Sequence, residues 1–243
     1  MPSFAQILLI AAVFLLAGLV KGAIGLGLPT VAVGLLGLVM PPAEAAAILV
    51  VPSLVTNAWQ LAAGPAIRPL LRRLWPMLAG IALGTALFAG ALQAGHAARV
   101  AMGASLLAYG LLGLANVPLD VPPRAERLLS PLVGLVNGAV TAATGTFVLP
   151  SVPFLQSIRL GREELIQALG LSFTVSTIAL AGALAGHGLF GRGALLGSVG
   201  ALLPALAGMQ LGTWLRGRVR PATFRRAFFA GTAALGLHLA VAG

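Results

Sequence analysis

The chain has 243 residues, of which 59% are hydrophobic and only 8% are charged. A soluble domain carries about a quarter charged residues, so this composition indicates a multi-pass integral membrane protein. The net charge of +10 does not indicate nucleic-acid binding, because the arginines stand singly or in small groups between apolar runs, where they meet the headgroups of the lipid bilayer. The absence of cysteine excludes disulfides, thiol nucleophiles and cysteine-ligated metals.

Apolar segments fill the chain from its first residues onward. The N-terminal segment lacks the basic region of a secretory signal, so we interpret it as a retained transmembrane segment. Arginines, Pro-Pro pairs and acidic residues divide the rest, and the pattern predicts ten membrane segments. They cover residues 4–20, 23–40, 43–64, 74–93, 97–115, 128–143, 146–158, 164–187, 194–215 and 223–242. The seventh is short and contains Pro150 and Pro153, so we expect a half-helix or a re-entrant segment there.

An internal duplication divides these segments into two halves of five. The stretch GLVKGAI at 18–24 returns as GLVNGAV at 134–140, and such repeats are typical of secondary transporters. Later positions also match: Glu44 with Glu164, Asn57 with Thr177, and the Ala-Gly-x-x-x-Gly-Thr pattern at 79–85 with 207–213. We therefore predict an all-α integral membrane protein of two repeats, with short or broken helices at the glycine motifs. Residues 1–115 form the first repeat, 116–127 the connecting loop and 128–243 the second repeat.

The positions of the basic residues predict the orientation of the halves. Thirteen lie in the odd-numbered connections between segments, and two, Arg99 and Arg192, lie in the even-numbered ones. Basic connections normally face the cytoplasm, and an odd number of crossings per half then makes the two repeats inverted, with both termini outside. The same parity follows if the first two segments of each half form a re-entrant hairpin, so full crossing and re-entry both stay open.

Glycines and prolines predict the broken helices and a substrate site. In the first half Gly22, Gly25 and Gly27 precede Pro29, and proline is favoured in the first turn of a helix. In the second half, hydroxyl residues replace most glycines before Pro150: the set is Asn137, Gly138, Thr141, Thr144, Gly145 and Thr146. We expect the two breaks to meet near mid-membrane and to offer helix N-termini and hydroxyl groups to an anion. The alternative is that the small residues only allow close helix packing.

Polar side chains form a stripe on the third segment. Ser53, Thr56, Asn57 and Gln60 fall on one helical face, and the matching eighth segment carries Ser172, Thr174, Ser176 and Thr177. A polar stripe within a membrane helix faces protein or water, so we expect these residues to line the same central cavity. Hydroxyls that bond back to their own helix are the alternative for serine and threonine, but not for the amides.

Lys21 is the one cation within an apolar run. At depth it would attract an anion, and near the membrane edge it would extend to lipid headgroups. Asn137 stands at the matching position of the second half, so the repeat does not require a charge there. Both interpretations of Lys21 stay open.

The remaining motifs indicate structural roles. We interpret Gly80-x-x-x-Gly84 and Gly208-x-x-x-Gly212 as helix-packing faces. Glu44 and Glu164 are expected to cap helix N-termini. Catalysis is not indicated, since the three histidines are scattered, Asp120 is the sole aspartate and no catalytic motif occurs. We expect neither a cofactor nor a metal site.

Three parts of the chain resemble the TauE/SafE family of sulfite exporters and organosulfonate permeases: KGAIGLGLP at 21–29, PPAEAAA at 41–47 leading to Asn57-Ala-Trp-Gln60, and the second-half copy. The resemblance implies an inner-membrane transporter of sulfite, sulfoacetate, thiosulfate or a related anion. It also implies that the glycine breaks and the neighbouring polar faces form the site, which would work by alternating access. The second half departs from the glycine-rich pattern, which leaves the exact substrate open.

Other functions and partners also stay open. A passive anion channel and a non-transporting membrane subunit are the rival interpretations. The expected partners are a small anion and the lipid bilayer, with no nucleic acid. Coupling to protons or another ion, the direction of transport and the formation of an oligomer are not indicated by the residues.

Overall fold

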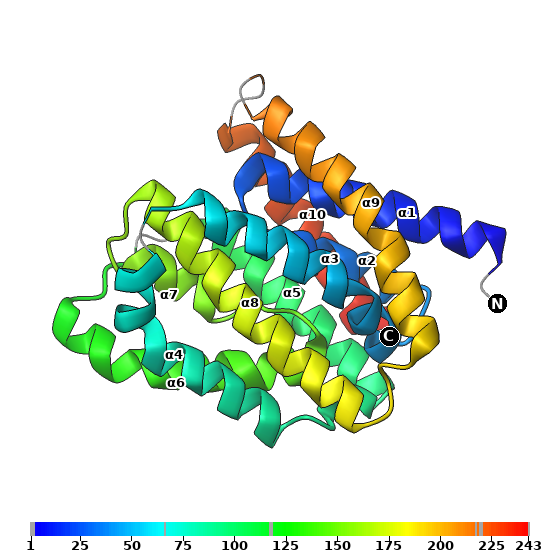
Figure 1. The fold of residues 1–243 in the computed structure, drawn as a ribbon, viewed down its shortest axis with the longest axis horizontal. Coiled ribbons are helices and arrows are strands. Elements are labelled where there is room, and N and C mark those ends of the chain that lie inside the picture. Colours follow the sequence, from blue (N-terminus) through cyan, green and yellow to red (C-terminus); the bar gives the residue numbers. More distant parts are fainter. Residues whose placement is uncertain (1–2, 66, 117–118, 217, 219–220, 243) are drawn as a thin grey trace.

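The computed structural model describes residues 3–65, 67–116, 119–216, 218 and 221–242, and all regular secondary structure in these ranges is helical. Ten α-helices and a short 3-10 helix, η1, follow one another along these ranges (Figure 1). They are α1 Phe4–Ile24, α2 Leu28–Leu36, α3 Pro42–Ala63, α4 Ile67–Leu87, η1 Ala91–Gln93, α5 His96–Ala115, α6 Pro123–Thr144, α7 Ser151–Ser157, α8 Arg162–Gly186, α9 Arg192–Leu215 and α10 Pro221–Ala242.

The helices match the ten predicted segments one to one, which confirms the all-α prediction. Six of them, α1, α3, α4, α5, α8 and α9, are long and apolar enough to cross a membrane. The helices α2 and α7 have nine and seven residues, less than half of the roughly 20 needed to span a bilayer. The expectation of a short seventh segment is therefore confirmed, and the second segment is short as well.

Two helices start earlier than predicted. The α4 helix begins at Ile67 rather than at residue 74, and α6 begins at Pro123 rather than at residue 128. Arginine interrupts an apolar run but is a good helix former, so both helices extend through their arginines. The predicted connecting loop, 116–127, thus ends before Pro123.

The helices break at the glycine segments, as predicted, but just after the repeated stretch rather than within it. Its first copy, 18–24, lies entirely within α1, and its second copy, 134–140, lies within α6. The helices end one residue before Gly25 and Gly145, which have φ angles of +83° and +70°. Glycine adopts this left-handed conformation without steric cost and therefore ends helices.

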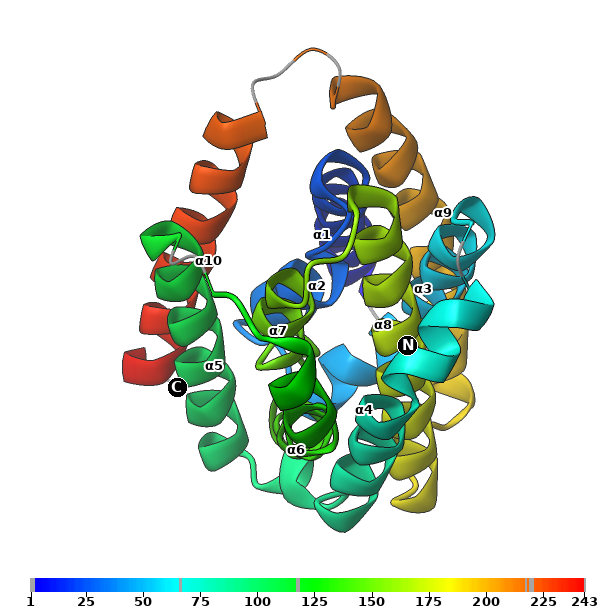
Figure 2. The same ribbon diagram turned by 90° about the vertical axis from the view of Figure 1, so that its left-hand side faces the viewer.

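Helices from the two halves are interleaved. The first helix of each repeat packs lengthwise on the fourth helix of the other, so that α1 lies on α9 and α6 on α4, while α5 pairs with α10 (Figures 1 and 2). The helices α3 and α8 contact each other, and α3 also contacts α9 as α8 contacts α4. In Figure 2 the short helices α2 and α7 lie between the α5–α10 pair and the remaining helices. The same contacts recur when the halves are exchanged.

Glycines make the two lengthwise pairs possible. A β-carbon on Gly208 or Gly212 would overlap the carbonyl oxygens of Leu15 and Leu19 on α1, and one on Gly80 or Gly84 would overlap backbone atoms of α6. Close approach of helix backbones through small residues is the usual way in which membrane helices associate. The predicted role of both Gly-x-x-x-Gly patterns in packing is confirmed.

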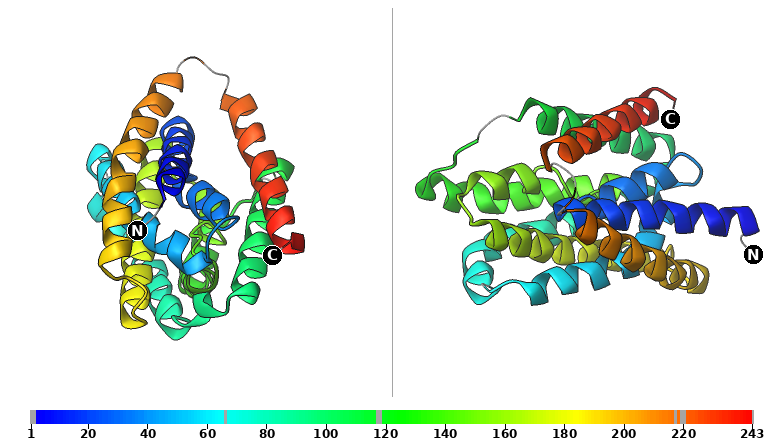
Figure 3. Two further views of the ribbon diagram at one scale, coloured as in Figure 1. Left: turned by 90° about the vertical axis from the view of Figure 1, so that its right-hand side faces the viewer. Right: turned by 90° about the horizontal axis from the view of Figure 1, so that it is seen from above.

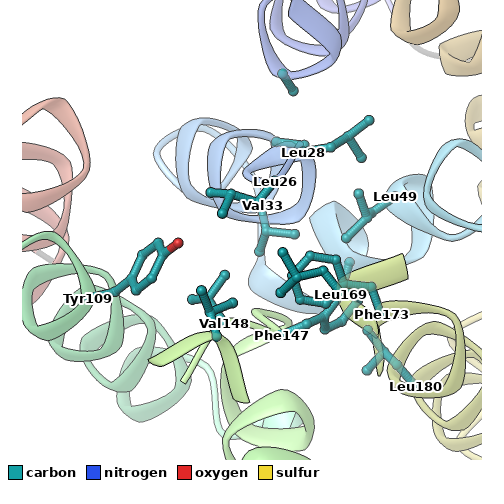
Figure 4. Close-up of a cluster of buried hydrophobic side chains, with 14 of the residues drawn as sticks. Leu26, Leu28, Val33, Leu49, Tyr109, Phe147, Val148, Leu169, Phe173 and Leu180 are labelled. Atoms are coloured by element: carbon teal, nitrogen blue, oxygen red, sulfur yellow. The ribbon is translucent and has the colours of Figure 1, made fainter. Parts of the chain in front are cut away.

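An apolar core surrounds the two short helices. Figure 4 shows Leu26, Val33, Phe147 and Phe173 among the side chains that meet there, from the break before α2, from α2, from the segment between α6 and α7, and from α8. Phe147 and Phe173 are completely buried, with ring centroids 6.3 Å apart. The N-terminal part of α1 extends beyond the other helices at one end of the molecule (Figure 3).

Candidate functional site

Lys21 lies inside the protein, near the end of α1. Its side chain is 2% exposed, and Nζ donates hydrogen bonds to Thr56 Oγ1, at 3.0 Å, and to Asn57 Oδ1 on α3. A side chain buried in this way does not extend to lipid headgroups. In the described part of the chain the ion pairs are Arg73–Glu126 and Arg159–Asp120, so no carboxylate neutralises Lys21.

The polar stripe of α3 is buried within the protein. Ser53, Thr56 and Asn57 are completely buried and Gln60 is 8% exposed. Asn57 Nδ2 donates to Ser53 Oγ over 3.2 Å, and Ser53 Oγ lies 2.9 Å from Thr177 Oγ1 on α8. Because the Thr177 hydroxyl also bonds the Phe173 carbonyl at 2.6 Å, it accepts from Ser53. A continuous hydrogen-bonded row thus joins Lys21 to α8.

Gln60 connects α3 to the first helix break. Its Nε2 donates to the Gly25 carbonyl oxygen over 2.6 Å, while its buried Oε1 has no hydrogen-bond partner in the described structure. Gly27 precedes α2 with a φ of +103°, and α2 begins at Leu28 with Pro29 in its first turn. The predicted helix start near Pro29 is confirmed.

Helix α8 carries one buried hydroxyl without a hydrogen-bond partner in the described structure. Ser172 and Ser176 are both completely buried, one helical turn apart. Ser172 Oγ has no hydrogen-bond partner within the described residues. Such an unpaired buried hydroxyl costs free energy unless a ligand or water completes it.

The second break is more self-contained than the first. In the amide orientation that satisfies both of its ends, the Asn137 amide nitrogen lies 2.9 Å from Ser151 Oγ, 3.0 Å from the Leu149 carbonyl oxygen and 3.1 Å from that of Phe147, and its two hydrogens are shared among these acceptors. It therefore holds the segment between α6 and α7 in place. Its amide oxygen then lies 3.5 Å from Ser176 Oγ. The contact corresponds to the one between Lys21 and Thr56 in the first half.

The threonines of the second break mainly bond to backbone. The Thr141 and Thr144 hydroxyls donate to the carbonyl oxygens four residues earlier, over 2.8 and 2.7 Å. Thr146 Oγ1 lies 2.8 Å from Thr144 Oγ1. Thr141 and Thr144 therefore bond back to their own helix in this conformation, which is the alternative to a cavity-lining role for hydroxyl side chains.

Three predicted site glycines lie in helix contacts instead of at the polar cluster. A β-carbon on Gly22 would overlap the Met209 carbonyl oxygen of α9, and one on Gly138 would overlap the Ile81 carbonyl oxygen of α4. Gly145 lies against Val33 and Ala46. The structure thus brings Gly25 to the polar row, and places Gly22, Gly138 and Gly145 against neighbouring helices.

One further cation lies close to Lys21 along α1. Arg216, just after α9, donates through Nη2 to the Gly22 carbonyl oxygen, at 2.6 Å, and through Nε to that of Ala23, at 3.1 Å. These bonds satisfy carbonyl groups that a helix C-terminus leaves unpaired. Nothing in the local sequence of α1 predicts this contact with a residue 194 positions after Gly22.

A cavity of about 530 Å³ lies between α5, α7 and α10. Arg225 and Asn116, which are hydrogen-bonded to each other, and Phe229 are among its lining residues. Tyr109 lines it too, and its buried hydroxyl, without a partner in the described structure, points from α5 toward the interior (Figure 4). Phe228, next to the lining residue Phe229, lies close to Gly27 at the first helix break.

Apolar spanning helices, two short internal helices and a buried polar row define the class of multi-pass membrane transporters. More specifically, the chain belongs to the sulfite exporter TauE/SafE family, whose model matches residues 10–239. The resemblance seen in the sequence is thereby confirmed. Comparisons with curated proteins and with solved structures found no match.

Proposed function

We propose that this protein carries a small sulfur-containing anion, with sulfite as the simplest candidate, across the bacterial inner membrane. The observation that supports this most strongly is Lys21, an enclosed cation without a carboxylate partner among the described residues. Burial of an unpaired charge is costly in a medium of low polarity, and an oxyanion beside Nζ would offset that cost. A substrate of opposite charge is the natural complement of this site.

Sulfite and related oxyanions present several acceptor oxygens, and the polar row offers donors to them. Lys21 has three N–H groups, of which two are used by Thr56 and Asn57. The third is available to a substrate, as is the unpaired hydroxyl of Ser172. Charge-assisted hydrogen bonds of this kind are stronger than neutral ones. In this proposal the second break positions α7, and the first break with α3 and α8 binds the anion.

Transport requires that the site opens to each side in turn. The polar row is enclosed by protein on α3 and α8, which fits an occluded conformation. The cavity beside Arg225 would be the entrance on the side of the basic connections, with its cation attracting the anion. Movement of one repeat against the other would then expose the site alternately, as in other transporters built from repeats.

Inverted repeats are part of this proposal. The exchange of partners between halves, α1 on α9 and α6 on α4, supports a two-fold relation, and the distribution of arginines supports opposite orientations. Lys21 lies within α1 and so is not part of a connection. Twelve basic residues in the odd-numbered connections against two in the even-numbered ones still give the same charge bias.

A labelling experiment tests the orientation. The chain contains no cysteine, so single cysteines at Ser3 and Val241 report which side each end faces. We expect both positions to react with an impermeant maleimide added outside intact cells, and a cysteine at Arg162 to react only after lysis. Protection of either terminal position until lysis would contradict the inverted arrangement.

The proposed substrate class is tested by thermal unfolding of the purified protein in the presence of sulfite, sulfate, thiosulfate, sulfoacetate, acetate or chloride. A ligand at one hundred times its Kd adds about 2.7 kcal/mol to the free energy of unfolding, which corresponds to roughly 5–10 °C for a protein of this size. We expect this shift with a sulfur oxyanion and not with acetate or chloride. Equal shifts with all anions, or none, would contradict the proposal.

A further inference from the structure

A second charged site lies on the outside of the α4–α6 pair, away from the polar row. It is a cleft of about 610 Å³ at the ends of α4 and α6 that carry the arginines. Its lining contains Arg72, Arg73, Trp75, Glu126, Arg127 and Ser130. Cationic and aromatic side chains therefore meet at one end of a helix that is long and apolar enough to cross the membrane.

The charges of this cleft do not cancel. Arg73 donates to both carboxylate oxygens of Glu126, over 2.7 and 2.8 Å. Its Nη2 also donates to the Ile158 carbonyl oxygen over 2.8 Å. Glu126 is thereby neutralised. Arg72 and Arg127 are exposed and take part in no ion pair of the described structure. The lining keeps two unpaired positive charges.

The floor of the cleft holds an unused hydrogen-bonding group. Ser130 is 2% exposed, and its Oγ has no hydrogen-bond partner in the described part of the chain. A buried hydroxyl is usually paired in a folded protein. The unpaired hydroxyl of Ser130 therefore indicates a polar ligand in the cleft, independently of the arginines.

The equivalent helix pair, α1–α9, shows that packing does not need these groups. We align the two pairs in sequence so that Gly134 matches Gly18 and Gly80 matches Gly208. The cleft residues then match apolar or small residues of α1 and α9. Arg72, Trp75, Glu126, Arg127 and Ser130 correspond to Gly200, Leu203, Ile10, Ala11 and Phe14. Phe14 is completely buried, whereas the small Ser130 adjoins an open cleft. The α1–α9 pair therefore makes the same contact without charge or hydroxyl.

We propose that this cleft binds the phosphate headgroup of an anionic phospholipid of the surrounding bilayer. Arginine forms bidentate hydrogen bonds to phosphate, and basic pockets between membrane helices are suited to acidic lipids. Trp75, 63% exposed, and Leu128, 79% exposed, flank the arginines with surface that acyl chains and the membrane interface would cover. A small soluble anion would leave that apolar surface uncovered, which favours the lipid as the source of the phosphate.

Lipid-dependent thermal stability tests the proposal. Purified protein in a neutral detergent is titrated with cardiolipin, phosphatidylglycerol, phosphatidylcholine or inorganic phosphate, and the unfolding temperature is measured. We expect the anionic lipids at saturation to raise it by about 5–10 °C, and phosphatidylcholine and inorganic phosphate to have no effect. An equal shift with inorganic phosphate would identify a small-anion site and overturn the proposal.

Two double variants separate a specific cleft from general surface charge. The variant R72Q/R127Q removes the two unpaired cations of the cleft, and R68Q/R124Q removes two exposed arginines one turn away on the same helices. Both change the net charge equally. We expect the first to lose at least half of the cardiolipin shift and the second to keep it. Equal losses in the two variants, with unchanged unfolding temperatures in phosphatidylcholine, would overturn the assignment.

Discussion

Replacement of Lys21 by methionine is expected to reduce the flux of sulfite by at least about 30-fold, since loss of one partner of a buried charged contact costs about 2–5 kcal/mol. Methionine keeps most of the length and volume of the side chain without its charge, so the packing of α1 on α9 should remain. The free energy of unfolding should not fall, because the variant no longer buries an unpaired cation. The measurement is uptake of radiolabelled sulfite into liposomes that contain the purified protein.

The matched control for Lys21 is Arg68→Met, which removes an exposed cation from the start of α4. We expect this control to transport within about twofold of the unchanged protein, since exposed charges are screened and contribute little. If Lys21→Met transported as well as the control, Lys21 would not bind the substrate. The site would then have to be placed elsewhere in the fold.

Gly208→Ala is expected to have the largest effect on stability. The added β-carbon would overlap the carbonyl oxygen of Leu15, so α1 and α9 would have to separate. Overpacking of a close contact costs about 1–3 kcal/mol, and backbone atoms cannot move aside as a flexible side chain does. The loss appears as a lower unfolding temperature in detergent and as a smaller monodisperse fraction in size-exclusion chromatography.

Gly182→Ala is the control for this substitution. Gly182 lies within α8, and a β-carbon there would meet nothing within 4 Å. Alanine stabilises a helix interior by roughly 0.5–1 kcal/mol relative to glycine, so the same change should here raise stability slightly. If both variants shifted the unfolding temperature in the same direction, close backbone contact would not be the reason for the glycine at position 208.

The fold could be predicted to a large extent because its signals are local. Apolar runs and their interruptions predict ten helices, and glycines spaced by four predict the packing faces. The helix starts at Ile67 and Pro123 could not be predicted in the same way, because arginine both ends an apolar run and extends a helix. Composition alone does not distinguish these roles.

The site could be predicted only in part, because its chemistry depends on contacts between distant segments. The buried face of α3 follows from the spacing of Asn57 and Gln60. The depth of Lys21 does not follow from its sequence neighbours, since it depends on α3 and α9 enclosing the end of α1. A lone lysine within an apolar run was the available signal, and it fits both a buried and an exposed position.

The repeat alignment contains one further signal, which concerns the hydroxyls of the second break. Gly25 follows Lys21 by four residues, whereas Gly145 follows Asn137 by eight, so α6 continues for one more turn before it ends. Thr141 and Thr144 lie on that additional turn and donate to the carbonyl oxygens of Asn137 and Val140 in the turn before it. The hydroxyls of the second break are therefore paired within that break, whereas Lys21, which has no carboxylate partner in the described structure, lies in the first half.

The central claim, a sulfur-anion carrier that alternates between two sides, is tested most directly by counterflow. Liposomes that contain the purified protein are loaded with unlabelled sulfite and diluted into a trace of labelled sulfite. We predict that labelled sulfite accumulates transiently above its equilibrium level, that the rate saturates with sulfite concentration, and that Lys21→Met abolishes the accumulation. Entry of label without accumulation would indicate a passive channel, and the absence of protein-dependent entry would contradict transport of sulfite.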